Sequence, residues 1–114
     1  MNTSLASPKQ PWKPADATDQ IRGLAINSRL ALHLSQHAKD QMMEREIYTS
    51  DVLHVLKHGF VYDRPEDATK ANCFKYKIES TSPVGPKVVK LVVIPWISPP
   101  EIKIVTVMWR DEKN

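Results

Sequence analysis

Long hydrophobic runs are absent from this 114-residue sequence. The longest apolar stretch, from Val88 to Ile94, is interrupted by Lys90 and is much shorter than the roughly 20 residues that a membrane-spanning helix needs. Residues 1–13 are polar and lack the apolar segment that forms the centre of an export signal. The sequence therefore predicts neither a membrane span nor export.

Cysteine is nearly absent, and neither charge is in large excess. Cys73 is the single cysteine and has no partner for an internal disulfide, which small secreted domains often need, so we predict a cytoplasmic protein. Lys and Arg number 16 against 13 for Asp and Glu, and the excess lies entirely in residues 64–114. That asymmetry suits a phosphate-rich partner, although excesses of this size also occur in proteins that bind no nucleic acid.

Length and composition predict a single folded domain. The chain is 41% hydrophobic and 25% charged, close to ordinary globular usage, and its length leaves no room for a second core. Pro8, Pro11 and Pro14 prevent helix formation near the N-terminus. We therefore expect a flexible tail over residues 1–15 and one domain over residues 16–114.

The first part of the domain is predicted to contain a short helix and a strand. The helix begins at a capping residue, Asp16 or Thr18, and continues to about Asn27. Large apolar residues then alternate over residues 30–34, which favours a strand, with a continuous helix as the alternative. The strand is preferred because Ser35 then lies where the next helix needs an N-cap.

Two further helices are predicted to meet at a tight corner. Residues 36–46 contain no Gly, Pro or β-branched residue and place apolar side chains on one stripe. A second helix begins near Thr49 or Ser50, and Gly59 is expected to end it in a left-handed conformation.

The second half reads as antiparallel strands. The expected strands are residues 60–62, 73–80, 88–94 and 102–108, with a turn at 63–67 and a rigid proline-bounded loop at 95–100. The predicted fold class is α+β, with two to three short helices packed on a mainly antiparallel sheet of about four strands.

One group of candidate functional residues lies on the helix over residues 36–46. His37, Gln41, Glu44 and Arg45 project from its polar side and could combine acid–base chemistry with phosphate binding. A solvated helix surface explains the same pattern, since a cation near a helix C-terminus is favourable. His33 and His37 have the spacing of a metal pair, but a helix start lies between them, so no metal site is predicted.

A second group lies on the predicted strands. Basic residues alternate on them and could form a basic sheet surface, with aromatic rings available to stack on bases. The alternative is that the aromatic residues fill the core and the lysines solvate a sheet face. The basic residues are Lys75, Lys77, Lys90, Lys103 and Arg110, and the aromatic residues are Tyr76, Trp96 and Trp109.

Residues 35–61 carry a motif that resembles a bacterial family, domain-of-unknown-function family 4258. The family pattern is Ser-x-His-Ala-x-x-Arg-Met-x-x-Arg-x-Ile, followed by a capped short helix that ends in Gly. The likeness covers roughly residues 29–109, and Gln41 stands where the family has its first arginine. The matching residues are His37, Ala38, Met42, Arg45, Ile47 and Gly59.

The resemblance implies a domain similar to the RelE and barnase-like toxin ribonucleases, which occur in toxin–antitoxin systems. It implies metal-independent cleavage of RNA without a cofactor, and partners that are RNA and a cognate antitoxin or another protein. By this likeness the catalytic residues are His37 as base or acid, Arg45 as phosphate ligand, and Lys75 and Arg110 from the sheet. The nucleic-acid-binding residues are Gln41, Tyr76, Lys77 and Trp96.

A non-catalytic module that binds protein or nucleic acid is the alternative function. In that interpretation the His-Ala-x-x-Gln-Met-x-x-Arg motif is structural, and Arg45 holds the loop at Tyr48 and Thr49. The missing charge at Gln41 favours it.

Overall fold

The computed structural model describes residues 9–83 and 85–111, which form three helices and six strands. The predicted α+β class is confirmed, but the sheet is mixed and has more strands than expected. The helices are α1 (Pro14–Ala25), α2 (Gln36–Arg45) and α3 (Thr49–His58). The strands are β1 (Ala31–Leu34), β2 (Phe60–Val61), β3 (Glu66–Asp67), β4 (Phe74–Thr81), β5 (Val88–Trp96) and β6 (Glu101–Trp109).

The sheet has the strand order β1-β6-β5-β4-β2, with β3 paired to β4. Strand β1 runs parallel to β6, and the other pairs are antiparallel. The segment expected to be only a turn contains β3, because Glu66 and Asp67 pair with β4. The expected loop at 95–100 begins later, because Pro95 and Trp96 still pair with β6.

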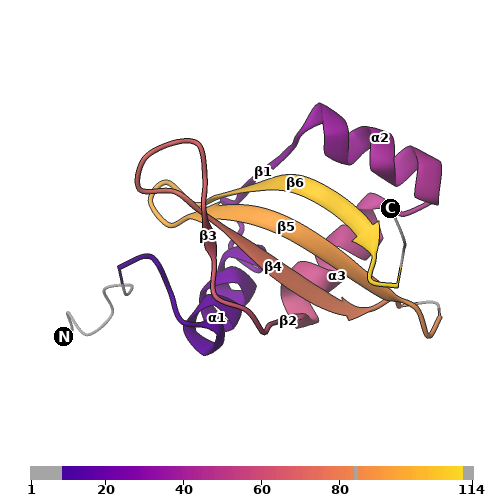
Figure 1. Cartoon of the computed structure of the whole chain (residues 1–114), viewed down its shortest axis with the longest axis horizontal. Coiled ribbons are helices and arrows are strands. Elements are labelled where there is room, and N and C mark those ends of the chain that lie inside the picture. Colours follow the sequence, from indigo (N-terminus) through magenta and orange to yellow (C-terminus); the bar gives the residue numbers. More distant parts are fainter. Residues whose placement is uncertain (1–8, 84, 112–114) are drawn as a thin grey trace.

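The helices cover one face of the sheet. Figure 1 shows α1 and α3 behind the long strands and α2 beside β6. Alternate residues of the strands, such as Tyr76, Leu91 and Ile104, point to this side and are fully buried, in the same core cluster as Val55 and Leu56 of α3. In the part of the chain that the structure describes, no helix packs on the opposite face.

Ser35 caps α2 as predicted. Its hydroxyl accepts a hydrogen bond from the Ala38 N–H at 3.0 Å and donates one to the Val105 carbonyl at 3.0 Å. The predicted start of α1 is wrong, because the helix begins at Pro14. Proline suits the first helical position, where its missing N–H would have had no partner. Thr18 instead donates to the Pro14 carbonyl and accepts from the Val61 N–H.

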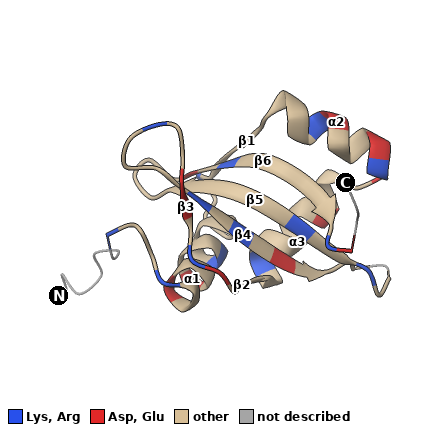
Figure 2. Cartoon of the chain, viewed as in Figure 1, with Lys and Arg blue, Asp and Glu red and all other residues tan. Residues whose placement is uncertain are grey.

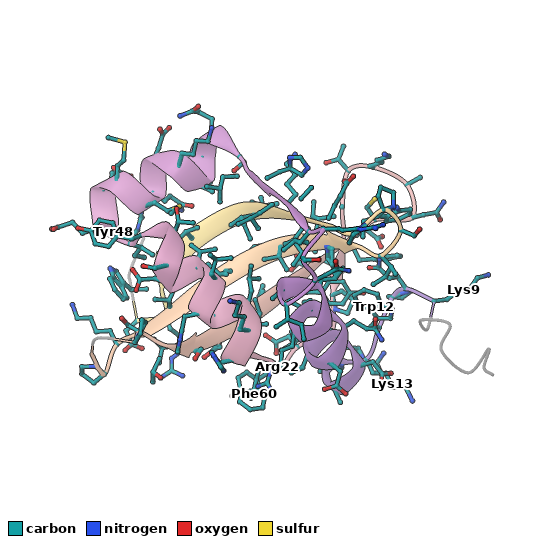
Figure 3. The ribbon with its side chains drawn as sticks, turned by 180° about the vertical axis from the view of Figure 1, so that it is seen from behind. Lys9, Trp12, Lys13, Arg22, Tyr48 and Phe60 are labelled. Atoms are coloured by element: carbon teal, nitrogen blue, oxygen red, sulfur yellow. The ribbon has the colours of Figure 1, made fainter. Side chains whose placement is uncertain are left out.

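The N-terminal segment is packed against the domain, which contradicts the expected tail from residue 9 onward; residues 1–8 lie outside the described residues. Trp12 is 2% exposed, and its ring lies 5.3 Å from that of Tyr76. Its backbone N–H donates to the Tyr76 hydroxyl, which donates to the Gln10 side chain at 3.0 Å. Figure 3 shows Trp12 turned inward and Lys9 directed outward. The tail prediction is wrong because the prolines show only that the segment cannot be helical. Burial of the Trp12 indole is what holds the segment against the domain.

Tyr76 should make the stability of the fold sensitive to alkaline pH. Burial raises the pKa of its hydroxyl, and the hydrogen bond from the Trp12 backbone lowers it by a smaller amount. Because the unfolded chain releases this proton more readily, the stabilisation is complete below about pH 10 and is lost as the pH rises further. Melting temperatures measured from neutral pH to about pH 11 should therefore fall more steeply for the wild type than for Tyr76→Phe. Parallel curves for the two proteins would contradict the prediction.

Gly59 ends α3, but not in the left-handed conformation that we expected. Its φ of −78° and ψ of 176° are extended, and the reason for glycine is close packing. A Cβ atom would lie 2.5 Å from the Val55 carbonyl oxygen and 2.8 Å from that of Glu79.

Gly59→Ala should therefore reduce the free energy of unfolding by about 1–3 kcal/mol, the usual effect of overpacking. Gly23→Ala is the matched control, since nothing lies within 4 Å of a Cβ there and the position is helical. It should stabilise the protein by about 0.5–1 kcal/mol. Urea unfolding of both variants checks the difference, and equal effects would contradict it.

Candidate functional site

The uncovered face of the sheet is rich in basic side chains. The residues that alternate with the buried ones on β4, β5 and β6 point to this side. Figure 2 shows basic positions on all three strands. Five basic and three acidic residues therefore belong to this face or its end, and one of the acidic residues, Glu66 of β3, lies beside Lys75. The basic excess still attracts anions. The residues are Lys75, Lys77, Lys90, Lys103, Arg110, Glu66, Glu79 and Glu101.

A cavity of about 790 Å³ opens on this face. It lies where the loop of residues 68–73, between β3 and β4, rises over the sheet, and Lys75, Trp96, Glu101 and Lys103 line it. Its volume falls within the range of about 300–1,000 Å³ that is common for small-molecule sites.

The register of the strands places four residues side by side in a row across the sheet at this cavity. His33 of β1 is opposite Lys103 of β6, and Lys103 is opposite Ile94 of β5. Continuing the β4–β5 register from Tyr76 and Val93 places Lys75 beside Ile94. Neighbouring strands lie about 4.8 Å apart, so the two lysine Cα atoms are about 10 Å apart. Two flexible ammonium groups at this spacing can reach one anion held above Ile94.

Two other members of this arrangement supply proton-transfer groups. Glu101 precedes Lys103 by two residues and is half-buried in the cavity wall, so both side chains lie on the same face. The His33 side chain is exposed beside Lys103, while its neighbours Leu32 and Leu34 pack on the core. Lys75, Glu101 and Lys103 thus line the cavity, and the His33 imidazole lies beside Lys103 but outside the cavity lining.

The predicted sheet residues are only partly brought together. Lys75 and Trp96 line the cavity, and Trp96 is 39% exposed, whereas Lys77 lies further along the face beside Val92. Arg110 is at the far end, where its backbone pairs with Val88, about 20 Å along the strand from the cavity. Its guanidinium is 3.0 Å from the Glu79 carboxylate. Tyr76 is fully buried on the helix side, so its expected role in stacking on a base is wrong.

The predicted residues of α2 do not reach the cavity. His37 is exposed, and Arg45, with 23% of its side chain exposed, lies 3.4 Å from the Glu44 carboxylate. Neither residue lines the cavity. Gln41 is 6% exposed and accepts a hydrogen bond from the Val107 N–H at 2.9 Å, so its predicted contact with nucleic acid is wrong.

The position of Gln41 follows from the short length of β1. Strand β1 pairs with β6 only as far as Ile104, and Val105 forms a bulge immediately beyond it. The rest of the β6 edge would have unpaired backbone groups. Helix α2 covers it, with the Ser35 hydroxyl on the Val105 carbonyl and Gln41 on the Val107 N–H.

Gln41→Leu should therefore lower the free energy of unfolding by about 1–3 kcal/mol, because it leaves a buried N–H without an acceptor. Gln36→Leu on the same helix is the matched control, since Gln36 is exposed and donates its hydrogen bond to the exposed Asp40. The control should change stability by no more than about 0.5 kcal/mol. Urea unfolding gives both values, and equal small losses would show that the Gln41 hydrogen bond contributes little.

Sequence reasoning missed His33 and Glu101 as site residues. The sequence identifies Lys103 as a basic strand residue. Its neighbours across the sheet depend on the parallel pairing of β1 with β6, which links residues 70 positions apart. The signal for His33 was its place between Leu32 and Leu34, which puts its side chain on the opposite face from theirs.

Comparison with protein families gives one match. The family described as Domain of unknown function (DUF4258) matches residues 34–109. The chain belongs to the DUF4258 family. The match runs from the last residue of β1 to the last residue of β6, and thus contains every residue that lines the 790 Å³ cavity. His33 and the segment that holds Trp12 lie outside it.

Comparisons of this DUF4258 protein with curated proteins and with solved structures give no match. Among the described residues, no helix has the length and apolar character needed to cross a membrane. The same part of the chain contains no cluster of three or more His, Cys, Asp or Glu side chains suited to a metal ion.

Proposed function

We propose that this DUF4258 domain is a metal-independent endoribonuclease that cleaves single-stranded RNA at the cavity on the open sheet face. The observation that carries the proposal is the row of His33, Lys103, Ile94 and Lys75 across the sheet. Lys75, Lys103 and Glu101 line the cavity, and His33 lies beside Lys103 outside that lining. The half-exposed Trp96 ring adds a stacking surface. A sheet with helices on one face and a basic open face also supports a RelE or barnase-like fold.

The groups present suffice for attack by the ribose 2′-hydroxyl on the adjacent phosphate. Glu101 takes the proton from the hydroxyl, and the new O2′–P bond forms. The P–O5′ bond breaks, and the leaving oxygen takes a proton from the His33 imidazolium. Lys75 and Lys103 stabilise the charge that develops on the phosphate oxygens. The products are a 2′,3′-cyclic phosphate and a 5′-hydroxyl end.

Cleavage of a mixed-sequence RNA in the presence of EDTA tests the proposal. Wild type is compared with Lys75→Ala/Lys103→Ala and with a control that removes two exposed helix lysines, Lys39→Ala/Lys57→Ala. The two variants have the same net charge, so only the position of the lost cations differs. Cleavage by the wild type and the control, but not by the cavity variant, supports the proposal. Equal activity of the two variants, or none from the wild type, refutes it.

The second candidate function is a non-catalytic RNA-binding module. The burial of Gln41 and its hydrogen bond to Val107 favour it, since they give the α2 motif a structural role. Fluorescence anisotropy with the same RNA separates the two functions. Salt-sensitive binding that the cavity variant loses, without cleavage by the wild type, supports the module.

Under either function we propose a cytoplasmic location and an acidic protein partner, such as a cognate antitoxin, that covers the basic face. The partner would compete with RNA for Lys75 and Lys103, because both would bind by charge complementarity.

A further inference from the structure

A second cavity of about 560 Å³ lies beside the first. The N-terminal segment forms one wall through Gln10 and Trp12, and the ends of β4 and β5 form the other through Phe74 and Trp96. Asn72 and Trp96 line both cavities, so the two spaces adjoin at these residues. A ligand bound across this border would place one group beside Lys75 and Lys103 and another in the second cavity.

The lining of the second cavity suits a flat aromatic ligand with polar edges. The Trp96 indole N–H donates to the Ser98 carbonyl at 3.1 Å, which holds the ring in one orientation and leaves its π-face for stacking. Phe74 adds a second, half-buried ring. Nucleobases stack on such rings whatever their identity.

Asn72 supplies the polar group that can read a base edge. Within residues 9–83 and 85–111, its carboxamide makes no hydrogen bond, whereas both ends of the Gln10 amide are occupied, by the Pro95 carbonyl and the Tyr76 hydroxyl. Asn72 has a φ of 66°, and the loop around it is tied by bonds from Cys73 N–H to the Lys70 carbonyl and from Ala68 N–H to the Cys73 carbonyl. A carboxamide offers a donor and an acceptor side by side, which lets it pair with a base edge such as N6 and N7 of adenine, the usual bidentate partner of Asn.

We propose that the second cavity is a nucleobase subsite that prefers adenine, in which the base stacks on Trp96 and pairs with Asn72. The inference rests on the proposed function, because the phosphate attached to that nucleotide is the one held by Lys75 and Lys103. The subsite would make Asn72 and Trp96 determinants of the sequence at which RNA is cut. It also gives the N-terminal segment a role, since Gln10 and Trp12 close the cavity.

Titrations followed by ¹H–¹⁵N NMR spectra test the subsite with adenosine, inorganic phosphate and adenosine 3′-monophosphate as probes. Adenosine should shift the signals of Asn72, Phe74 and Trp96, phosphate those of Lys75 and Lys103, and the nucleotide both groups. Cytidine and uridine should bind more weakly than adenosine. Short oligoadenylate then distinguishes RNA from free nucleotide, because a substrate that is RNA should bind more tightly than the monophosphate.

Variants sharpen the test. Asn72→Gly removes the carboxamide at a positive φ that glycine tolerates, and Trp96→Leu removes the stacking ring. Each should weaken binding of the nucleotide about tenfold. The binding of phosphate should change much less, because neither variant removes a cation. Tyr62→Leu is the matched control, an exposed aromatic residue that lines neither cavity, and should leave binding unchanged.

The outcomes separate this inference from the proposed function. If RNA is cleaved but adenosine shifts no signal near Asn72 and the variants keep wild-type binding, the subsite is refuted and the ribonuclease stands. If adenosine shifts those signals while phosphate does not bind and RNA is not cleaved, the ribonuclease is refuted and the cavity is a nucleoside site only.

Discussion

Trp12→Ala is expected to lower the free energy of unfolding by about 3–5 kcal/mol, the usual range for removing a buried large aromatic side chain. Trp12 is 2% exposed, lies against Tyr76 at 5.3 Å and belongs to the same core cluster as Ile21 and Val93. The substitution removes the ring contact and leaves a space that the rigid sheet cannot close. Because natural domains are stable by only about 5–15 kcal/mol, the variant should be close to unfolding at room temperature.

Urea unfolding measures the loss, and Trp12→Phe gives a graded control that keeps an aromatic ring against Tyr76. Lys13→Ala, at the exposed neighbouring position, should change stability by no more than about 0.5 kcal/mol. A loss below about 1 kcal/mol for Trp12→Ala would mean that the N-terminal segment contributes little to the core.

His33→Ala is expected to reduce RNA cleavage by about 10²–10⁴-fold, the usual contribution of a positioned general acid. The side chain is exposed, so its removal should leave stability nearly unchanged. His33 lies next to Lys103 on the open face, and no other histidine among the described residues is paired with a cavity strand. The loss should therefore appear in the rate of cleavage, with RNA binding retained.

His37→Ala provides a matched comparison. His37 is also exposed and lies only four residues further along, but it belongs to α2 and is not paired with Lys103. Neither histidine is part of the cavity lining. Single-turnover cleavage and RNA anisotropy are measured for both variants. A large loss in His37→Ala with an active His33→Ala would move the active site to the helix face that the family motif indicated.

Local patterns were enough to predict the helical corner and the long strands. Ser35 caps α2 as expected because an N-cap depends on the residues that immediately follow it. Alternation also separated Lys75 from Tyr76, since neighbouring strand residues point to opposite faces. The alternation does not show which face the helices cover, so the sequence predicts both residues as site residues. In the structure, Tyr76 is buried in the core.

The missing information was long-range pairing. The row at the cavity joins residue 33 to residue 103 through a parallel pair, and the role of Gln41 depends on where β1 stops pairing with β6. Neither the parallel pairing nor the end of the β1–β6 pairing can be predicted from the residues nearby in the sequence. Gly59 shows the same limit, because its need for glycine arises from a carbonyl of Glu79, in a strand that follows 20 positions later.

Under the proposed function, the docking of the N-terminal segment makes substrate preference separable from catalysis. Gln10 and Trp12 close the adenine-preferring cavity, yet they lie outside the region shared with the DUF4258 family, whereas Lys75, Glu101 and Lys103 lie inside it. A family member with another residue in place of Trp12 must fill the space beside Tyr76 differently and would present another wall to the base. Exchange of this short segment between relatives could therefore give the same catalytic residues a different sequence preference. The stability of each such chimera would depend on how well the residue that replaces Trp12 packs against the core.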